Sequence, residues 1–142
     1  ACGNALIDPV LTEYGDIDTA LAVLKFDSGA GGLIDLSRQS NCGYDQRTEV
    51  HGSKGFAQVG NVPETTVSIH NEDGVHEDKP VYFFLERYAD AFVHAQATFF
   101  DVVNNGAEPP VTAYDGLQAV RIAKAATLSW RENRPVKLDE IP

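Results

Sequence analysis

The sequence predicts an α+β domain in which a mostly antiparallel open sheet comes first and two long helices pack on one of its faces. Two observations support this prediction. Residues 17–82 alternate short apolar runs with turn-forming clusters, whereas residues 83–131 carry apolar side chains at three- and four-residue steps. Strands followed by helices are typical of α+β domains.

Five or six strands are expected in the first part of the chain. Residues 17–26 have apolar side chains at both parities, which predicts a strand covered on both faces. The glycines of 27–32 favour a tight turn into a hairpin partner at 33–40. Four further short strands are expected at 46–51, 56–59, 65–69 and 75–79.

Two helices should follow the strands. An unbroken apolar stripe predicts the first helix at 84–104, and the sequence Asn104-Asn105-Gly106 is a typical helix end. The second helix should open at Thr112, because Asp115 stands three residues later in a capping-box arrangement. Residues 134–138 are expected to form a short returning strand.

The composition bounds the possible functions. The chain has 142 residues, with 11 Lys and Arg against 21 Asp and Glu, so its net charge is −10. That length fits one domain, and the acidic balance argues against nucleic acid and against an anionic membrane surface. No apolar run approaches the roughly 20 residues of a membrane helix. Only two cysteines are present, so a cytoplasmic location is expected.

Familiar cofactor and metal motifs fit poorly. The run from Gly29 to Gly32 resembles a dinucleotide-binding loop, but Ile34 stands where that motif needs a third glycine, which favours a hairpin turn. His70 and His76 flank a turn and could face each other across a hairpin. A metal site there is one interpretation, and a solvated acidic loop is the other.

Residues 37–47 are dense in hydrogen-bonding groups at the junction of two strands, where binding residues often concentrate. Their amides, phenol, carboxylate and guanidinium groups suit a ligand rich in hydroxyls. The alternative is a polar turn in which Arg38 and Arg47 pair with carboxylates such as Asp35 and Glu49. The residues alone leave both interpretations open.

Short motifs along nearly the whole chain resemble one family in their order and spacing. They include Ser28-Gly29-Ala30, Ser37-Arg38, Gly43-Tyr44-Asp45-Gln46-Arg47, Gly52-Ser53-Lys54-Gly55, Phe84-Leu85-Glu86-Arg87-Tyr88 and Arg134-Pro135-Val136. Together they resemble the C-terminal half of inositol 2-dehydrogenases, in the glucose-fructose oxidoreductase/inositol dehydrogenase/rhizopine-catabolism family.

This resemblance implies an NAD-dependent oxidation of a ring hydroxyl of myo-inositol, or of a related polyol or sugar, to the ketone. In the family a Rossmann half binds NAD, and a Lys with an Asp-X-X-X-His pair supplies the acid/base groups. No catalytic or cofactor-binding residue can be assigned here. Asp90 and His94 match the spacing, but they lie in the helix after the strands.

Residues 1–142 are therefore expected to be a C-terminal substrate-binding and oligomerisation domain, incomplete at its N-terminal side, with the cofactor domain absent. The chain starts at Ala1 and contains no methionine. On this interpretation the chain alone has no dehydrogenase activity. The alternative is a free-standing, non-enzymatic binding or oligomerisation module.

The resemblance also implies which residues meet the substrate and which surface meets other copies. Tyr44 is the first choice for a polyol contact, with Asp45 and Arg47 as second choices; a half-buried strand-end aromatic is the other interpretation of Tyr44. The sheet face away from the helices should remain apolar, with Leu21, Val23 and Leu33 among its residues, and is expected to form a homo-oligomer.

Overall fold

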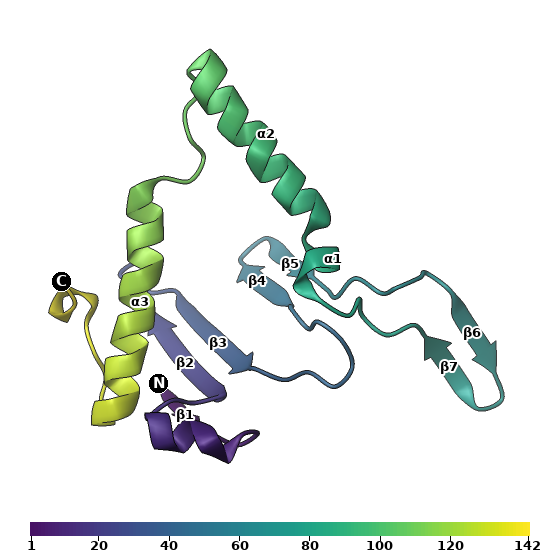
Figure 1. Cartoon of the computed structure of the whole chain (residues 1–142), viewed down its shortest axis with the longest axis horizontal. Coiled ribbons are helices and arrows are strands. Elements are labelled where there is room, and N and C mark those ends of the chain that lie inside the picture. Colours follow the sequence, from purple (N-terminus) through teal and green to yellow (C-terminus); the bar gives the residue numbers. More distant parts are fainter. The chain divides into compact units, whose positions relative to one another are not determined.

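The computed structural model describes residues 1–142, which divide into two compact units. The first unit comprises Ala1–Gln39 and Pro109–Pro142, and the second comprises Ser40–Glu108. Antiparallel strands and two long helices confirm the predicted α+β class (Figure 1). The strands pair differently from the expectation of one open sheet, because seven strands form hydrogen-bonded sheets of three, two and two.

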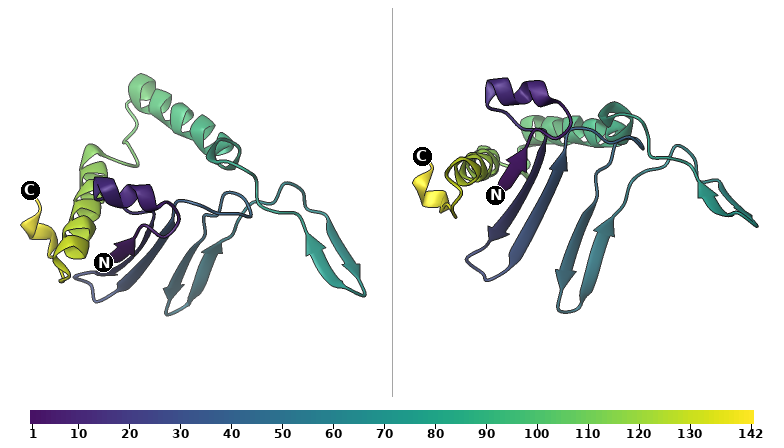
Figure 2. Two further views of the ribbon diagram at one scale, coloured as in Figure 1. Left: turned by 60° about the horizontal axis from the view of Figure 1, so that its bottom comes forward. Right: turned by 90° about the horizontal axis from the view of Figure 1, so that it is seen from below.

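The sheet of the first unit contains β1 (Cys2–Asn4), β2 (Thr19–Lys25) and β3 (Gly31–Ser37), in that order and antiparallel throughout (Figure 2). The β2–β3 hairpin pairs Leu21 with Asp35 and Val23 with Leu33. Neither β1 nor the 3-10 helix η1 (Pro9–Tyr14) was predicted. Both are too short to show a periodicity.

A buried carboxylate fastens the beginning of the chain to this sheet. The side chain of Asp18, which is 4% exposed, accepts hydrogen bonds from the backbone N–H groups of Leu6, Ile7 and Asp8 at 2.9, 2.8 and 2.8 Å. The Thr19 hydroxyl donates a fourth at 2.9 Å. Burial by itself raises the pKa of Asp18, but these four donors outweigh it and lower the pKa to about 2.

Helix α3 (Ala113–Glu132) packs beside β1. The Thr112 hydroxyl accepts from the Asp115 N–H, and the Asp115 carboxylate accepts from Thr112, so the predicted capping box is confirmed. At the other end of the helix the Trp130 indole donates to the Gly3 carbonyl at 2.9 Å. The N-terminal ammonium of Ala1 donates to Ser129 Oγ at 2.7 Å. Helix α3 and the sheet thus partly bury each other where they pack.

The predicted strand at 134–138 is wrong. This segment joins no sheet and leads into the 3-10 helix η2 (Leu138–Glu140). The Arg121 guanidinium on α3 donates to the carbonyls of Leu138 and Ile141 at 2.8 and 2.9 Å, and Arg134 donates to Glu140 at 2.8 Å. Side chains therefore satisfy the backbone acceptors that a ladder would otherwise have used.

The two faces of β2 differ in exposure, contrary to the expectation that both are covered. Ala20, Ala22 and Leu24 are half-buried on one face. On the other face Leu21 is 43% exposed and Val23 78% exposed. This face of the β2–β3 hairpin therefore presents the apolar side chains of Leu21, Val23 and Leu33 to solvent, with Asp35 opposite Leu21.

The second unit contains two hairpins followed by helices. Its hairpins are β4 (Thr48–Gly52) with β5 (Gly55–Val59) and β6 (Ser68–Asn71) with β7 (Gly74–Glu77). Gly55 and Gly74, with φ of 145° and 127°, make tight turns that force each strand to pair with its sequence neighbour. The register pairs His70 with Val75 and His76 with Ile69, so the two histidines lie on opposite faces of their hairpin.

The predicted helix at 84–104 is divided in two. Helix α1 (Phe84–Arg87) and helix α2 (Ala89–Asn105) are separated at Tyr88, whose φ of −113° and ψ of 14° interrupt the helix. The predicted end at Gly106 is confirmed, since that residue caps α2 in the left-handed conformation with φ of 68°. No helix in the structure has both the length and the apolar character needed to cross a membrane.

Candidate functional site

The polar loop, which we define as residues 43–47, leads into β4 in the second unit. It begins with a close backbone approach at Gly43, where φ is 122° and a Cβ would stand 2.5 Å from the Pro80 carbonyl oxygen. The next residue, Tyr44, donates its N–H to the Val81 carbonyl at 2.9 Å. The start of the loop is therefore fixed against the segment that follows β7.

A third extended segment supports that contact from the other side. Val81 donates its N–H to the Val62 carbonyl at 2.9 Å, and Glu64 donates to the Lys79 carbonyl at 3.0 Å. An antiparallel bridge joins Pro63 and Pro80 between these two bonds. Residues 62–64 and 79–81 thus form a short ladder against which the polar loop rests.

Charged and amide side chains hold the middle of the loop. The Arg47 guanidinium pairs with the Asp45 carboxylate through two parallel bonds, Nε to Oδ1 at 2.8 Å and Nη2 to Oδ2 at 2.9 Å. Asn61 Nδ2 donates to Asp45 Oδ1 at 2.7 Å, while Asn61 Oδ1 accepts the Gln46 N–H at 2.9 Å. The hydrogen bonds from Arg47 and then Asn61 lower the pKa of Asp45, so this carboxylate is charged near neutral pH.

Two phenols meet beside this network. The rings of Tyr44 and Tyr88 form an edge-to-face pair with centroids 5.7 Å apart and planes at 84°. The Tyr88 hydroxyl donates to Gln46 Oε1. Burial, followed by the neighbouring Tyr44 phenol, raises the pKa of Tyr88. The break between α1 and α2 therefore places a protonated phenol against the loop.

The structure brings the three sequence-predicted residues, Tyr44, Asp45 and Arg47, into one loop. Arg47 pairs with Asp45, whereas Glu49 accepts from Gln58 at 2.7 Å. Tyr44 is half-buried, with one side of its ring against Tyr88. The loop can offer a phenol, a carboxylate and a guanidinium to a ligand, which is a combination suited to recognising hydroxyl groups.

Sequence reasoning missed Asn61 and Tyr88. Asn61 follows Gly60 after β5, where an asparagine is typical of any turn. Tyr88 fits the apolar stripe of the predicted helix, and its phenol was the only sign of a polar role. Neither residue lies near the polar loop in sequence.

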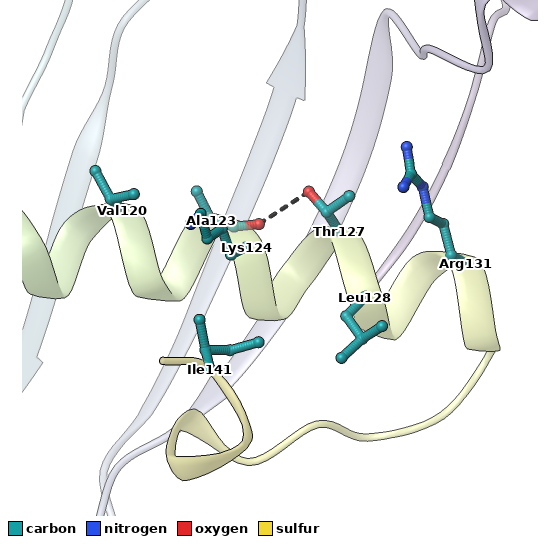
Figure 3. Close-up of a pocket in the computed structure, with 7 residues that line it drawn as sticks. All are labelled: Val120, Ala123, Lys124, Thr127, Leu128, Arg131 and Ile141. Carbon is teal, nitrogen blue, oxygen red and sulfur yellow. Dashed lines mark hydrogen bonds between the residues drawn. The ribbon is translucent and has the colours of Figure 1, made fainter.

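A second concavity belongs to the first unit. It is a groove of about 430 Å³ between α3 and the C-terminal segment, lined by Val120, Ala123, Lys124, Thr127, Leu128, Arg131 and Ile141 (Figure 3). The Thr127 hydroxyl donates a hydrogen bond to the Ala123 carbonyl at 3.0 Å. The lining is mostly apolar, so this groove is less suited to a polyol than the polar loop. The structure contains no group of three or more His, Cys, Asp or Glu side chains that could hold a metal ion.

Antiparallel hairpins and two long helices, with a polar loop that leads into β4, define an α+β domain. Comparison with known proteins identifies the family. Residues 5–138 match the C-terminal alpha/beta domain of an oxidoreductase family that includes the glucose-fructose oxidoreductases and inositol dehydrogenases, and the chain belongs to this family.

Individual relatives agree with this assignment. The chain is 46% identical over 141 residues to a myo-inositol 2-dehydrogenase of Thermotoga maritima, covering 99% of the chain and 42% of the relative. A crystal structure of a probable dehydrogenase from Thermotoga maritima has a TM-score of 0.94 and 45% identity, covering 99% of this chain and 42% of its own.

A third relative was solved with ligands. The scyllo-inositol dehydrogenase of Lactobacillus casei, with bound cofactor NAD(H) and scyllo-inositol, has a TM-score of 0.87 and 29% identity. The similarity covers 97% of this chain and 41% of that one. The chain thus spans about two fifths of the length of the relatives it matches.

Proposed function

We propose that this chain is the substrate-binding and oligomerisation domain of a dehydrogenase that oxidises a ring hydroxyl of myo-inositol, or of a related polyol or sugar, to the ketone with NAD. The observation that carries the proposal is the polar loop, which Asn61 holds through two hydrogen bonds, within a domain whose relatives include myo- and scyllo-inositol dehydrogenases. The remaining length of those relatives leaves room for a cofactor domain.

The residues of this chain do not fit the dinucleotide. Gly29 lies at the turn between β2 and β3 and Gly32 lies within β3, so no helix begins there to direct its N–H groups at a pyrophosphate. We therefore assign NAD to a separate domain and derive no hydride-transfer step from the residues of this one. Two free, exposed cysteines fit a reducing cytoplasm.

In this proposal Tyr44 is the principal substrate contact. Its ring is supported on one side by Tyr88, and its backbone is fixed to Val81. A phenol held in this way can exchange a hydrogen bond with a ring hydroxyl while its aromatic surface covers the carbon face of the polyol. Asp45 and Arg47, one and three residues further along the loop, are the second candidates for contacts to neighbouring hydroxyls.

The test is Tyr44→Phe in the native dehydrogenase that includes this chain, assayed with NAD and myo-inositol. Loss of one neutral hydrogen bond of about 1 kcal/mol should raise the KM about fivefold and change kcat little. Tyr14→Phe is the matched control, since Tyr14 is 78% exposed and belongs to the other unit. Unchanged KM in Tyr44→Phe rejects the contact.

The chain by itself should show no turnover of NAD and myo-inositol above a blank, because hydride transfer needs a bound nicotinamide and a base in addition to the substrate contact. Measurable turnover would contradict this. The alternative, a free-standing binding or oligomerisation module, is distinguished by the coding sequence upstream of Ala1: a glycine-rich strand–turn–helix region there favours the enzyme.

We further propose that a second copy covers the apolar β2–β3 face, giving a homo-oligomer. Leu21, Val23 and Leu33 lie on this face and are 43%, 78% and 70% exposed. Exposed apolar side chains grouped on one sheet face are typical of association sites. Two copies of such a face can pack sheet to sheet through the same residues.

A further inference from the structure

Asn61 lies outside the polar loop in sequence but makes two of its hydrogen bonds. Its Oδ1 accepts the Gln46 N–H at 2.9 Å, and its Nδ2 donates to Asp45 Oδ1 at 2.7 Å. One short side chain from the segment after β5 thus binds both the backbone and a side chain of the loop. Asn61 is itself half-buried.

A side-chain amide is well suited to this pair of contacts. It presents an acceptor and a donor a fixed distance apart, whereas a carboxylate at neutral pH offers acceptors only. The donor is needed on the Asp45 side, because that carboxylate is charged, and the acceptor is needed on the Gln46 side. The chemistry of the two partners therefore favours asparagine over aspartate at this position.

The clamp holds the backbone of the loop at Gln46. Tyr44 is held by the Val81 carbonyl, but the Gln46 N–H is satisfied by the Asn61 side chain and not by a strand. Tyr88 adds a third restraint through Gln46 Oε1. Without Asn61 the backbone between Tyr44 and β4 would sample further conformations, and ordering it again would oppose ligand binding.

We propose that Asn61 is a positioning residue for polyol binding: its amide clamps Asp45 and Gln46 and so fixes the Tyr44 phenol where the substrate meets it. This inference rests on the proposed function of the polar loop. Asn61 acts through the loop and does not itself touch the substrate. Its loss should therefore weaken substrate binding and leave the chemical step largely unchanged.

The experiment compares Asn61→Ala, Asn61→Asp and Asn71→Asp in the native dehydrogenase. The first variant removes both arms of the clamp, and the second keeps the acceptor but sets a carboxylate against Asp45. Asn71→Asp is the control: Asn71 lies in β6, and its Oδ1 accepts the Asp73 N–H, a role that aspartate retains. Asn61→Asp keeps the native shape, so it carries the test if Asn61→Ala fails to fold.

Two readouts are measured: KM and kcat with NAD and myo-inositol, and hydrogen–deuterium exchange of a peptide containing residues 44–47. We expect both Asn61 variants to raise KM about tenfold with kcat within about twofold, corresponding to the loss of a charge-assisted hydrogen bond. Exchange of the peptide should accelerate in Asn61→Ala, where Gln46 loses its acceptor. The control should match the wild type in both readouts.

The outcomes separate this inference from the proposed function. If Tyr44→Phe raises KM while both Asn61 variants leave KM and exchange unchanged, the clamp is rejected and the polyol contact stands. A fall in kcat with unchanged KM also overturns the positioning role. If exchange accelerates in Asn61→Ala but KM for myo-inositol responds to neither Tyr44 nor Asn61, the positioning role in polyol binding is overturned together with the proposed substrate contact.

Discussion

Replacing Gly43 with alanine perturbs the point at which the polar loop is fixed to its neighbours. Gly43 has a φ of 122°, in a region that residues with a side chain rarely adopt. An added Cβ would lie 2.5 Å from the Pro80 carbonyl oxygen and 3.1 Å from the Val81 carbonyl oxygen. Both are backbone atoms, so no flexible side chain can move aside.

The size of the effect follows from two separable costs. The positive φ costs about 1–3 kcal/mol for a residue with a Cβ. Relieving the clash requires moving residues 80–81, which weakens the Tyr44 N–H bond to Val81, worth about 0.5–1.5 kcal/mol. The free energy of unfolding should therefore fall by about 2–4 kcal/mol. The displaced Tyr44 should also raise the KM for myo-inositol.

Two other glycines of the same unit separate these costs. Gly55 has a φ of 145° but no atom within 4 Å of its added Cβ, so Gly55→Ala tests the backbone cost alone. Gly60 has neither a positive φ nor a close neighbour, so Gly60→Ala should be neutral or slightly stabilising. Urea unfolding followed by circular dichroism should give the order Gly43→Ala, Gly55→Ala, Gly60→Ala, most destabilised first. Equal destabilisation by the first two would refute the close-approach argument.

Three further predictions concern the first unit. The pKa of Asp18 falls from 3.8 to about 2 on folding, so its contribution to stability is complete above pH 3.8 and is lost as the pH falls toward 2. Asp18→Asn should therefore remove the loss of stability between these pH values from an acid-unfolding curve, and an unchanged curve would contradict this. Gly116→Ala, in α3 with nothing within 4 Å, should raise stability by about 0.5–1 kcal/mol in thermal unfolding, and destabilisation would show a hidden contact. If the β2–β3 face is the interface between copies, Val23→Lys should lower the mass measured by light scattering, whereas the control Val120→Lys on α3 should not. Equal masses for the two variants would reject the β2–β3 face as the interface.

Local sequence signals predicted the elements whose ends have local causes. Thr112 and Asp115 form their capping box through side chains three residues apart, and Gly106 ends α2 because glycine adopts the left-handed conformation readily. The two tight hairpins follow from glycine turns in the same way. In these places the residues that determine the structure are neighbours in sequence.

The missed features depend on contacts between distant residues. The segment at 134–138 has strand-like residues, but the Arg121 guanidinium on α3 donates hydrogen bonds to the carbonyls of Leu138 and Ile141. The apolar stripe through Tyr88 predicts one helix, yet the phenol bonds to Gln46 some forty residues earlier, and the helix divides there. Such partners come together only in the folded structure, so periodicity along the chain does not reveal them.

In the candidate site, too, local features were predicted and contacts between distant residues were missed. Tyr44, Asp45 and Arg47 were predicted because polar groups concentrate within a few residues at a strand end, and the resemblance to inositol dehydrogenases ranked Tyr44 first. Asn61 was missed because its two partners lie fifteen and sixteen residues away. The sequence thus indicated the loop, and the structure added the side chains that hold it.

The most direct test of the central claim is hydrogen–deuterium exchange of the native dehydrogenase with NAD, measured with and without myo-inositol. If the polar loop binds the polyol, the peptide containing residues 43–47 should gain protection on adding myo-inositol. Peptides of the groove lined by Val120 and Ile141 should not change. Unchanged exchange at 43–47 during turnover of myo-inositol would contradict the assignment of substrate binding to this loop.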